Sequence, residues 1–424
     1  MNQLFVYYES DKVGVIQRDQ DLVFSFRYTD EWLKRADHFP LSLTLKLENK
    51  NFGNKDTLSF FENLLPEGDT KASIEKSQDV HGVFDFLSKY GQDCAGAITI
   101  TSDENYTAPT AKQERVELEE AKIYQALKEK RSVAEVIADE NPGYLSLAGA
   151  QDKFPAIYDG KKFYLPKHGA PTTHIVKMPI YRHQIKDSVY NELYCMRLAQ
   201  RVGFQVPVCS IHVGEFPLFV VTRYDRQTDE KGIVHRLHQQ DFCQAQGITS
   251  EFKYEHSGGP SIKNNFELIM KNTLAKKRVE SINTLLDWVF FNLLIGNNDS
   301  HSKNLSFLLL GQRYEIAPLY DLVCTAIYPK LQKHFAFSIG GQNDYTKIGK
   351  KELKLLDRQL EFKEGTCQER MRAMHQKITQ HKSTNREQIT KEYGKISLLE
   401  RIEEIIEARA RTFANQKAID ITIY

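Results

Sequence analysis

Short runs of β-branched and aromatic residues alternate with polar turns over the first hundred residues, as at positions 4–8 and 22–26. Runs of this kind predict β-strands, and the apolar stretch at residues 58–65 predicts a helix. We therefore expect a small α+β unit at the start of the chain. The polar segment of residues 102–113 contains few aliphatic side chains, which indicates a linker, and we place a boundary near residue 108.

The pattern changes twice further along the chain. Strand-like runs dominate from about residue 153 to about residue 226, interrupted by one amphipathic helix that Asp187 could cap and Gly203 could end. Beyond about residue 237 helical spacing prevails, and the clearest helix covers residues 282–294 and is closed by Gly296. We predict an α+β fold in three segments, residues 1–108, residues 109–236 with a mixed sheet, and a mostly helical segment of residues 237–424.

The composition is typical of a folded globular protein and gives no general attraction to polyanions. Of 424 residues, 41% are hydrophobic and 27% are charged, and 57 basic against 56 acidic side chains leave a net charge of +1. Binding to nucleic acid or to an anionic membrane would therefore need a local patch. The chain start has no signal-peptide pattern and no apolar stretch reaches membrane-spanning length, so we expect a cytoplasmic protein that is not inserted in a membrane. Six scattered cysteines without a CxxC pair favour reduced core thiols over a zinc site.

The most informative window is a polar loop that directly follows the predicted buried helix. It contains Asp299 and Asn304, and it precedes an apolar run, a tight turn and a returning strand that leads to Asp321. The predicted hairpin brings Asn304 and Asp321 near each other, with Asp299 one loop away. An amide oxygen and a carboxylate suit Mg²⁺, while a second carboxylate can orient a hydroxyl nucleophile. The spacing of five positions from Asp299 to Asn304 matches the catalytic loop of protein kinases.

Each of these signals also has a purely structural explanation. Asp299 and Asn304 both favour turns and could cap a helix-to-strand connection. Lys177 lies on a strand-like run where ATP phosphates and a helix glutamate such as Glu192 would offset its burial, although an edge-strand lysine can also reach solvent. The run of residues 218–226 could supply the hinge that binds adenine, or it could be an ordinary strand end. Phosphoryl transfer is favoured because the pieces of a nucleotide site occur together in the expected order.

Further motifs are distributed over the whole chain. They are Leu64-Leu65-Pro66-Glu67-Gly68, Asp93-Cys94-Ala95-Gly96-Ala97, Ser146-Leu147-Ala148-Gly149-Ala150-Gln151-Asp152-Lys153, Asn191-Glu192, Arg223-Tyr224-Asp225-Arg226, Lys253-Tyr254-Glu255, Gly258-Gly259-Pro260, Asn298-Asp299-Ser300-His301-Ser302-Lys303-Asn304 and Leu319-Tyr320-Asp321. Through them the chain resembles the HipA serine/threonine kinases, the toxin half of bacterial HipBA modules, nearly from end to end. The resemblance implies a two-lobed protein-kinase-like fold whose N-terminal α+β unit extends the small lobe and whose C-terminal lobe is mostly helical.

The resemblance also implies roles for the matching positions. Asp299 would be the catalytic base, and Asn304 and Asp321 would hold Mg²⁺ against the phosphates of ATP. The hinge for adenine would be Thr222, Arg223 and Tyr224. The other ATP-binding positions would lie in a segment that replaces the usual glycine-rich loop, on the lysine strand and beside the catalytic loop: Ala148, Gly149, Ala150, Gln151, Asp152, Lys153, Lys177, His301, Ser302, Lys303, Asn304, Tyr320 and Asp321.

Ser146 corresponds to a serine that HipA kinases autophosphorylate, and the resemblance implies that this modification expels the nucleotide loop and silences the kinase. A phosphate beside the phosphates of ATP would repel them and attract nearby cations. The alternative for Ser146 is a turn hydroxyl.

The function implied is that of an ATP- and Mg²⁺-dependent serine/threonine-protein kinase that acts as a growth-arresting toxin. Its expected substrate is a protein, an aminoacyl-tRNA synthetase with glutamyl-tRNA synthetase favoured. Its expected partner is a HipB-like helix-turn-helix antitoxin, through which it would mainly reach operator DNA. Lys350 and Lys351 belong to a basic cluster that could contact DNA phosphates, and a solvated loop is the alternative. From a different class of function, a catalytically silent corepressor acting with the antitoxin is the competing hypothesis, and transfer to a lipid or small molecule is chemically open.

Overall fold

The computed structural model describes residues 2–109, 115–140, 143–144, 147–167, 169–180 and 185–420. The chain forms two compact units, each assembled from separate stretches of sequence. Unit 1 consists of Met1–Met178, His212–Glu251 and Ser306–Arg313, and unit 2 consists of Pro179–Ile211, Phe252–Leu305 and Tyr314–Tyr424. The division at residues 108 and 236 concerns shorter subdomains and stays a prediction, and part of the expected linker lies outside the described residues.

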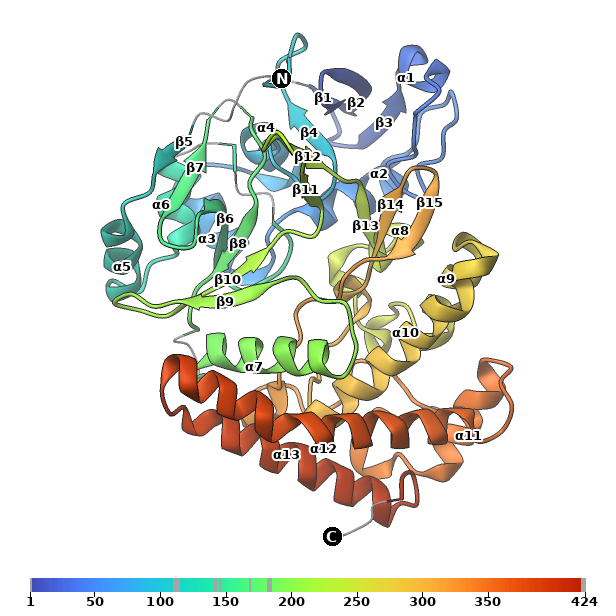
Figure 1. Ribbon diagram of the computed structural model, residues 1–424. Helices are drawn as coiled ribbons and strands as arrows, with labels where there is room; N and C mark the ends of the chain where they lie inside the picture. The colour runs from blue at the N-terminus through green and yellow to red at the C-terminus, as the bar shows by residue number, and fades with distance from the viewer. Residues whose placement is uncertain are drawn as a thin grey trace. The chain divides into compact units, whose positions relative to one another are not determined.

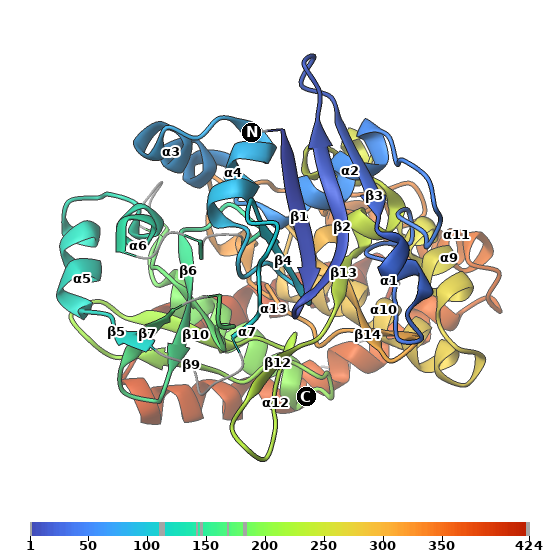
Figure 2. The same cartoon turned by 90° about the horizontal axis from the view of Figure 1, so that it is seen from above.

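A four-stranded antiparallel sheet in the order β3-β2-β1-β4 opens unit 1. Figure 2 shows β1, β2 and β3 side by side in blue. The strands are β1 (Gln3–Tyr8), β2 (Asp11–Arg18), β3 (Phe24–Tyr28) and β4 (Ile98–Thr101). The second apolar run begins two residues later than the pattern predicts, because Leu22 is 66% exposed in a turn with φ of +61°. The core of this sheet is formed by side chains such as Val6, Ile16 and Phe26, which are fully buried.

A second sheet of unit 1 contains strands in the order β5-β7-β6-β8-β10. These strands are β5 (Arg115–Glu117), β6 (Lys153–Tyr158), β7 (Phe163–Pro166), β8 (His174–Lys177) and β10 (Leu218–Thr222). The short strands that follow are β11 (Arg226–Thr228), β12 (Val234–Arg236) and β13 (Gln239–Asp241), and β13 pairs with β14 (Ser306–Leu310). The helices of this unit are α1 (Asp30–Lys34), α2 (Asn54–Phe61), α3 (Gly68–Gln78), α4 (Gly82–Tyr90), α5 (Glu120–Lys128), α6 (Val133–Glu140) and α8 (Phe242–Gln246), with the 3-10 turn η1 (Glu62–Leu64).

Unit 2 is mostly helical, as the spacing of apolar residues predicts. Its helices are α7 (Ser188–Arg201), α9 (Ile262–Asn272), α10 (Ala275–Ile295), α11 (Lys350–Gln359), α12 (Thr366–Tyr393) and α13 (Ser397–Asn415). Its shorter elements are β15 (Arg313–Ile316), which begins at the last residue of unit 1, and the 3-10 turns η3 (Glu255–Ser257), η4 (Ser302–Asn304), η5 (Thr325–Ile327) and η6 (Tyr345–Lys347). The remaining elements at the unit boundaries are β9 (Cys209–His212) and η2 (Ser250–Phe252). The long helices α12 and α13 pack against each other and against α7 (Figure 1).

Helix α10 is buried along most of its C-terminal half, and its end agrees with the prediction. Leu285, Val289 and Phe290 are fully buried. Gly296 follows the last helical residue with φ of +80°, a left-handed conformation that glycine adopts without strain. Helix α7 starts directly after Asp187, but the Asp187 side chain makes no capping hydrogen bond.

No helix in the described part of the chain is long and apolar enough to cross a lipid bilayer.

Candidate active site

The loop that follows α10 is buried except at one carboxylate. Asn297, Asn298, Ser300 and the residues from His301 to Asn304 are at most 8% exposed, whereas Asp299 is exposed. Gly296 starts this loop in a crowded place, where a Cβ atom would lie 2.9 Å from the Cβ atom of Ala326. The protein therefore holds the polypeptide on both sides of Asp299 inside its core and presents only the Asp299 side chain to solvent.

The backbone and side chain of Asp299 are each held by specific contacts within unit 2. The side-chain amide of Asn304 donates to the Asp299 carbonyl at 3.0 Å, and the His301 N–H donates to the same oxygen at 3.0 Å. The hydroxyl of Tyr254 donates to Oδ1 of Asp299. The second carboxylate oxygen can then orient and accept the proton of an incoming hydroxyl group.

The two predicted Mg²⁺ ligands lie on segments that the structure joins. Tyr320 donates its hydroxyl hydrogen to the Lys303 carbonyl at 2.7 Å, and Asn297 Nδ2 lies 3.4 Å from the Asp321 carbonyl. These contacts bring the loop around Asn304 against Asp321, which is the juxtaposition that the hairpin predicts. The Asn304 amide nitrogen is used by the bond to Asp299, so Oδ1 of Asn304 is the atom that can bind a cation. An amide oxygen and a carboxylate are suitable ligands for Mg²⁺.

In unit 1, the segment predicted to replace a glycine-rich loop docks on the start of α3. Ala148 leads into Gly149, whose φ of +104° favours glycine. The Gly149 carbonyl accepts a hydrogen bond from the Glu67 N–H at 3.0 Å, and the Ala150 carbonyl accepts one from the Thr70 hydroxyl at 3.0 Å. A Cβ atom at Gly149 would lie 2.7 Å from Nζ of Lys153, so glycine allows this ammonium group to approach the backbone of the turn.

A second ammonium group comes from the neighbouring strand. Lys153 on β6 is the direct cross-strand partner of Lys177 on β8, and Lys177 is 6% exposed. Two ammonium groups at directly opposed positions give a local concentration of positive charge, to which an anionic group is attracted. The pair of lysines next to the Gly149 turn therefore suits the phosphates of a nucleotide.

Two other side chains of this segment form hydrogen bonds that stabilise the fold. Gln151 donates to the Met178 carbonyl at 3.0 Å, and the Asp152 carboxylate accepts from the Ser132 hydroxyl at 2.9 Å and the Val133 N–H at 2.7 Å. Burial raises the pKa of Asp152, although these hydrogen bonds oppose the shift. Asp152 thus caps α6. Binding of ATP by Gln151 and Asp152 stays a prediction, in which their backbone groups would make the contact.

The catalytic-loop residues expected along the phosphates are also placed by neighbouring side chains. The rings of His301 and Tyr254 pack edge to face with centroids 5.0 Å apart. The Ser302 hydroxyl accepts from Asn265 Nδ2 at 2.9 Å, which ties η4 to α9. Lys303 is 6% exposed. Contact of His301, Ser302 and Lys303 with ATP stays a prediction.

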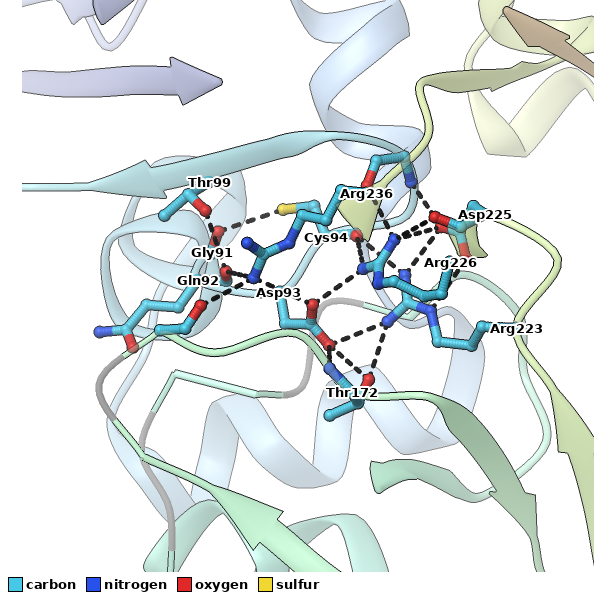
Figure 3. A network of polar contacts seen from close by, with 12 residues as sticks. Gly91, Gln92, Asp93, Cys94, Thr99, Thr172, Arg223, Asp225, Arg226 and Arg236 are labelled. Carbon is cyan, nitrogen blue, oxygen red and sulfur yellow. Dashed lines mark hydrogen bonds and ion pairs between the residues drawn. The ribbon is translucent and has the colours of Figure 1, made fainter. Parts of the chain in front are cut away.

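The predicted hinge contains an arginine, Arg223, whose backbone N–H and guanidinium group bind other groups of the protein. Thr222 ends β10 opposite His174, and the Arg223 N–H donates to the Thr173 carbonyl at 2.9 Å. The Arg223 guanidinium lies 2.9 Å from the Asp93 carboxylate and is 1% exposed (Figure 3). Tyr224 donates to Gln239 Oε1 at 2.8 Å. The adenine contact proposed for residues 222–224 stays a prediction, and Arg223 itself supports the fold around it.

Asp93 is the centre of a buried charge network in unit 1 (Figure 3). It accepts from Arg223 at 2.9 Å, Arg226 at 2.8 Å and Arg236 at 3.3 Å. Burial raises the pKa of this carboxyl, but the three guanidinium groups outweigh burial and hold the pKa well below its usual range. The network fastens the loop after α4 to the segment that follows the predicted hinge.

Four predicted positions have a different status. Ser146 lies outside the described residues. Glu192 is buried on α7 in unit 2, and its pairing with Lys177 stays a prediction. Lys350 and Lys351 are exposed in the first turn of α11.

The role of Tyr254 was not expected from sequence. It belongs to a motif shared with the HipA kinases, but local spacing does not indicate that its hydroxyl reaches a carboxylate 45 residues later. A tyrosine within such a motif, shortly before a glycine-rich turn, was the available signal.

Comparisons with known proteins match most of the chain. The HipA-like C-terminal domain matches residues 145–382, and the HipA N-terminal domain matches residues 4–101. The chain is 36% identical to the putative kinase Y4mE of Sinorhizobium fredii over 343 residues, covering 80% of each protein. It is 33% identical to the serine/threonine-protein kinase toxin HipA of Shewanella oneidensis over 338 residues, covering 77% of this chain and 75% of that protein.

The fold agrees with these similarities. A solved structure of Shewanella oneidensis HipA with HipB and its operator DNA matches with a TM-score of 0.82 and 26% identity, covering 99% of this chain and 100% of that one. The predicted α+β, kinase-like fold is therefore confirmed. The chain belongs to the HipA family of serine/threonine-protein kinase toxins.

Proposed function

We propose that this protein is an ATP-dependent serine/threonine-protein kinase in which Asp299 is the catalytic base. The observation that carries the proposal is the exposed Asp299 carboxylate on an otherwise buried loop, with Asn304 bonded to its backbone and Asp321 on the adjoining segment. This is the set of oxygen groups that phosphoryl transfer to a hydroxyl requires.

The residues present fit Mg²⁺ and ATP. Oδ1 of Asn304 and the Asp321 carboxylate would hold Mg²⁺, which when bound neutralises charge on the β- and γ-phosphates. The ammonium groups of Lys153 and Lys177 and the backbone of the Gly149 turn would bind phosphate oxygens. The proposed phosphate-binding groups belong to unit 1, and the proposed base and metal ligands belong to unit 2.

The chemistry assigned to Asp299 is a proton transfer. The oxygen of a serine or threonine hydroxyl attacks the γ-phosphorus while the bond from that phosphorus to the β–γ bridging oxygen breaks, which releases ADP. The hydroxyl proton passes to the Asp299 carboxylate. Tyr254 donates to Oδ1 of that carboxylate and keeps it turned toward the acceptor.

Phosphate transfer from labelled ATP tests the proposal. Wild-type protein with ATP and Mg²⁺ should label an acceptor protein, and Asp299→Asn should lose at least about 10²-fold in rate, the typical contribution of a positioned base. Asp21→Asn, which changes an exposed aspartate in the turn before β3, is the matched control and should keep full activity. Equal rates for wild type and Asp299→Asn would exclude Asp299 as the base.

We also propose the finer features that the family resemblance implies. The acceptor would be an aminoacyl-tRNA synthetase, with glutamyl-tRNA synthetase as the first candidate, and autophosphorylation at Ser146 would silence the kinase. Peptide mapping of protein incubated with ATP and Mg²⁺ should find one phosphate at Ser146 in wild type and none in Asp299→Asn. A phosphate at another residue would keep the kinase and reject Ser146 as the regulatory site.

A corepressor role with a HipB-like antitoxin on operator DNA is the second function we propose. It is favoured by Lys350 and Lys351, which form no ion pair with any residue the structure describes. If Asp299→Asn left every phenotype unchanged, the corepressor role would be favoured over the kinase, because a pure binding module does not need the carboxylate.

A further inference from the structure

One buried cation lies directly behind the catalytic loop. Arg409 on α13 is 3% exposed. Its Nη1 donates to the Leu293 carbonyl at 2.7 Å, and its Nη2 donates to Oδ1 of Asn298 at 2.9 Å. Asn298 immediately precedes Asp299, so a residue of the C-terminal helix reaches the neighbour of the proposed base across 111 positions of sequence.

The acceptors of Arg409 are neutral groups. They are a backbone carbonyl and a side-chain amide, and the guanidinium carbon lies 4.2 Å from the centre of the Tyr345 ring. Burial lowers the pKa of Arg409. Because burying a charge is unfavourable, an apolar side chain at this position of α13 would serve packing better. The position of this charge therefore calls for an explanation other than packing.

The first contact completes the end of α10. Leu293 lies in the last turn of α10, where backbone carbonyls have no partner within the helix. A positive charge at the C-terminus of a helix also interacts favourably with the helix dipole. Arg409 thus fixes the point at which the catalytic loop leaves α10.

The second contact fixes the orientation of the Asn298 amide. With Oδ1 of Asn298 bonded to Arg409, Nδ2 of Asn298 donates to the Gln332 carbonyl at 2.9 Å. The Asn298 N–H donates to the Thr325 hydroxyl at 2.8 Å. Asn298 is therefore held from three separate segments of unit 2, and Arg409 is the charged member of this set.

We propose that Arg409 is a positioning residue that holds Asn298, and through it Asp299, in the geometry needed for phosphoryl transfer. The proposal rests on the proposed function of Asp299 as the base. A displacement of about 1 Å at a reacting group can lower a rate by about 10²-fold, so the loss of one fixed contact behind the loop is sufficient for a large effect.

The test compares Arg409→Met and Arg409→Lys with the control Arg386→Met. Arg386 on α12 forms an ion pair with Glu403 on α13 at 3.1 Å, so the control weakens the attachment of the same helix without contact to the catalytic loop. Steady-state kcat and the KM for ATP are measured per folded molecule. Arg409→Met should lower kcat about 10²-fold with little change in KM. The kcat of Arg409→Lys should lie between those of wild type and Arg409→Met, because lysine keeps the charge with fewer hydrogen-bond donors. Arg386→Met should keep the wild-type kcat.

Two further readouts separate positioning from stability. Millimolar guanidinium in the assay should restore part of kcat for Arg409→Met and have no effect on Arg386→Met. Hydrogen exchange at residues 296–304 should increase in Arg409→Met and not in Arg386→Met. Wild-type kcat in folded Arg409→Met, or unchanged exchange in the loop, would overturn the proposal.

The same data show whether a negative result contradicts the proposed kinase function or only the role of Arg409. If wild-type protein transfers no phosphate to any acceptor or to itself, the kinase assignment fails and the catalytic role of Arg409 fails with it. Active wild type together with active Arg409→Met rejects only the positioning role.

Discussion

Asp93 shows how a single buried carboxylate can hold a segment next to the proposed nucleotide site. It is fully buried and is bonded to the guanidinium groups of Arg223 and Arg226, whose side chains are at most 2% exposed. Removing Asp93 leaves the buried guanidinium groups with fewer anionic partners, although Asp225 still pairs with Arg223 and Arg226, and this costs more than the loss of a surface pair.

We expect Asp93→Asn to lower the free energy of unfolding by about 3–5 kcal/mol, because three guanidinium groups lose their common anion. Urea denaturation at neutral pH measures this change. Asp85→Asn is the matched control, since Asp85 pairs with Arg18 at 2.9 Å on the surface and its loss should cost at most about 1 kcal/mol. Similar losses for both variants would contradict the importance of the buried network.

The Asp93 network also predicts how stability depends on pH. The pKa of Asp93 is lowered in the folded protein, so its contribution is fully present above the unfolded pKa of about 3.9 and is lost as the pH falls toward the folded pKa. Wild-type protein should therefore lose more stability than Asp93→Asn when the pH is lowered from 7 to below 4, measured by urea denaturation at each pH. Parallel pH profiles of the two proteins would contradict this assignment.

At the scale of elements, the end of α10 decides where the catalytic loop begins. Gly296 and Gly311 both adopt positive φ, of +80° and +63°. They differ in their surroundings, because a Cβ atom at Gly296 would lie 2.9 Å from Ala326, whereas one at Gly311 would have no neighbour within 4 Å. Alanine substitutions at Gly311 and Gly296 therefore separate the free-energy cost of a left-handed conformation from the cost of a steric clash.

Gly311→Ala should cost about 1–2 kcal/mol of unfolding free energy, the price of a left-handed conformation for an L-residue. Gly296→Ala should cost more than this and should also lower kinase activity, because the clash moves the start of the catalytic loop. Urea denaturation and phosphate transfer measured on the same preparations test both statements. If the two variants had equal stability and equal activity, crowding at Gly296 would be irrelevant.

The elements around the site were predictable to the extent that local pattern determines them. The apolar spacing of α10, its glycine end and the hairpin after Asn304 are local features, and the structure contains all three. The contact of Arg409 with Asn298 was not predictable in this way, because it joins segments 111 positions apart. An arginine among Ile402, Ile406 and Phe413 on the buried face of α13 was the available signal. Likewise, Asn191 belongs to a shared motif, but its bonds to the Cys324 backbone depend on tertiary packing.

At the scale of the whole molecule, the chain passes repeatedly between its two units. Residues 179–211 leave unit 1 for unit 2, and residues 306–313 return to unit 1 after the catalytic loop. A linear pattern of strands followed by helices predicts the class of fold but not this interleaving, because contacts between distant stretches determine it. Lys153, Lys177, Asp299 and Asp321 could be named as candidates from sequence, since each lies within one short motif, and their roles stay predictions.

The small net charge of the molecule makes a local DNA contact testable. With a net charge of +1, the chain has no general attraction to DNA, so the corepressor role proposed above depends on exposed cations that have no acidic partner. Lys347 and Lys354 pair with Asp344 at 3.5 Å and Glu364 at 2.5 Å. Lys350 and Lys351 form no such pair among the described residues, and they are therefore the better candidates.

Changing Lys350 and Lys351 together to glutamine should weaken binding of the antitoxin complex to operator DNA and reduce its dependence on salt. Each phosphate contact contributes about 0.9 to the slope of log affinity against log salt concentration, so the loss of two contacts should reduce the slope by about 1.8. Binding titrations at several salt concentrations measure the slope. Lys347→Gln with Lys354→Gln is the control and should change the slope much less, because both ammonium groups already have carboxylate partners. An equal change in both double variants would indicate a diffuse charge effect, and no change in either would place all DNA contacts on the antitoxin.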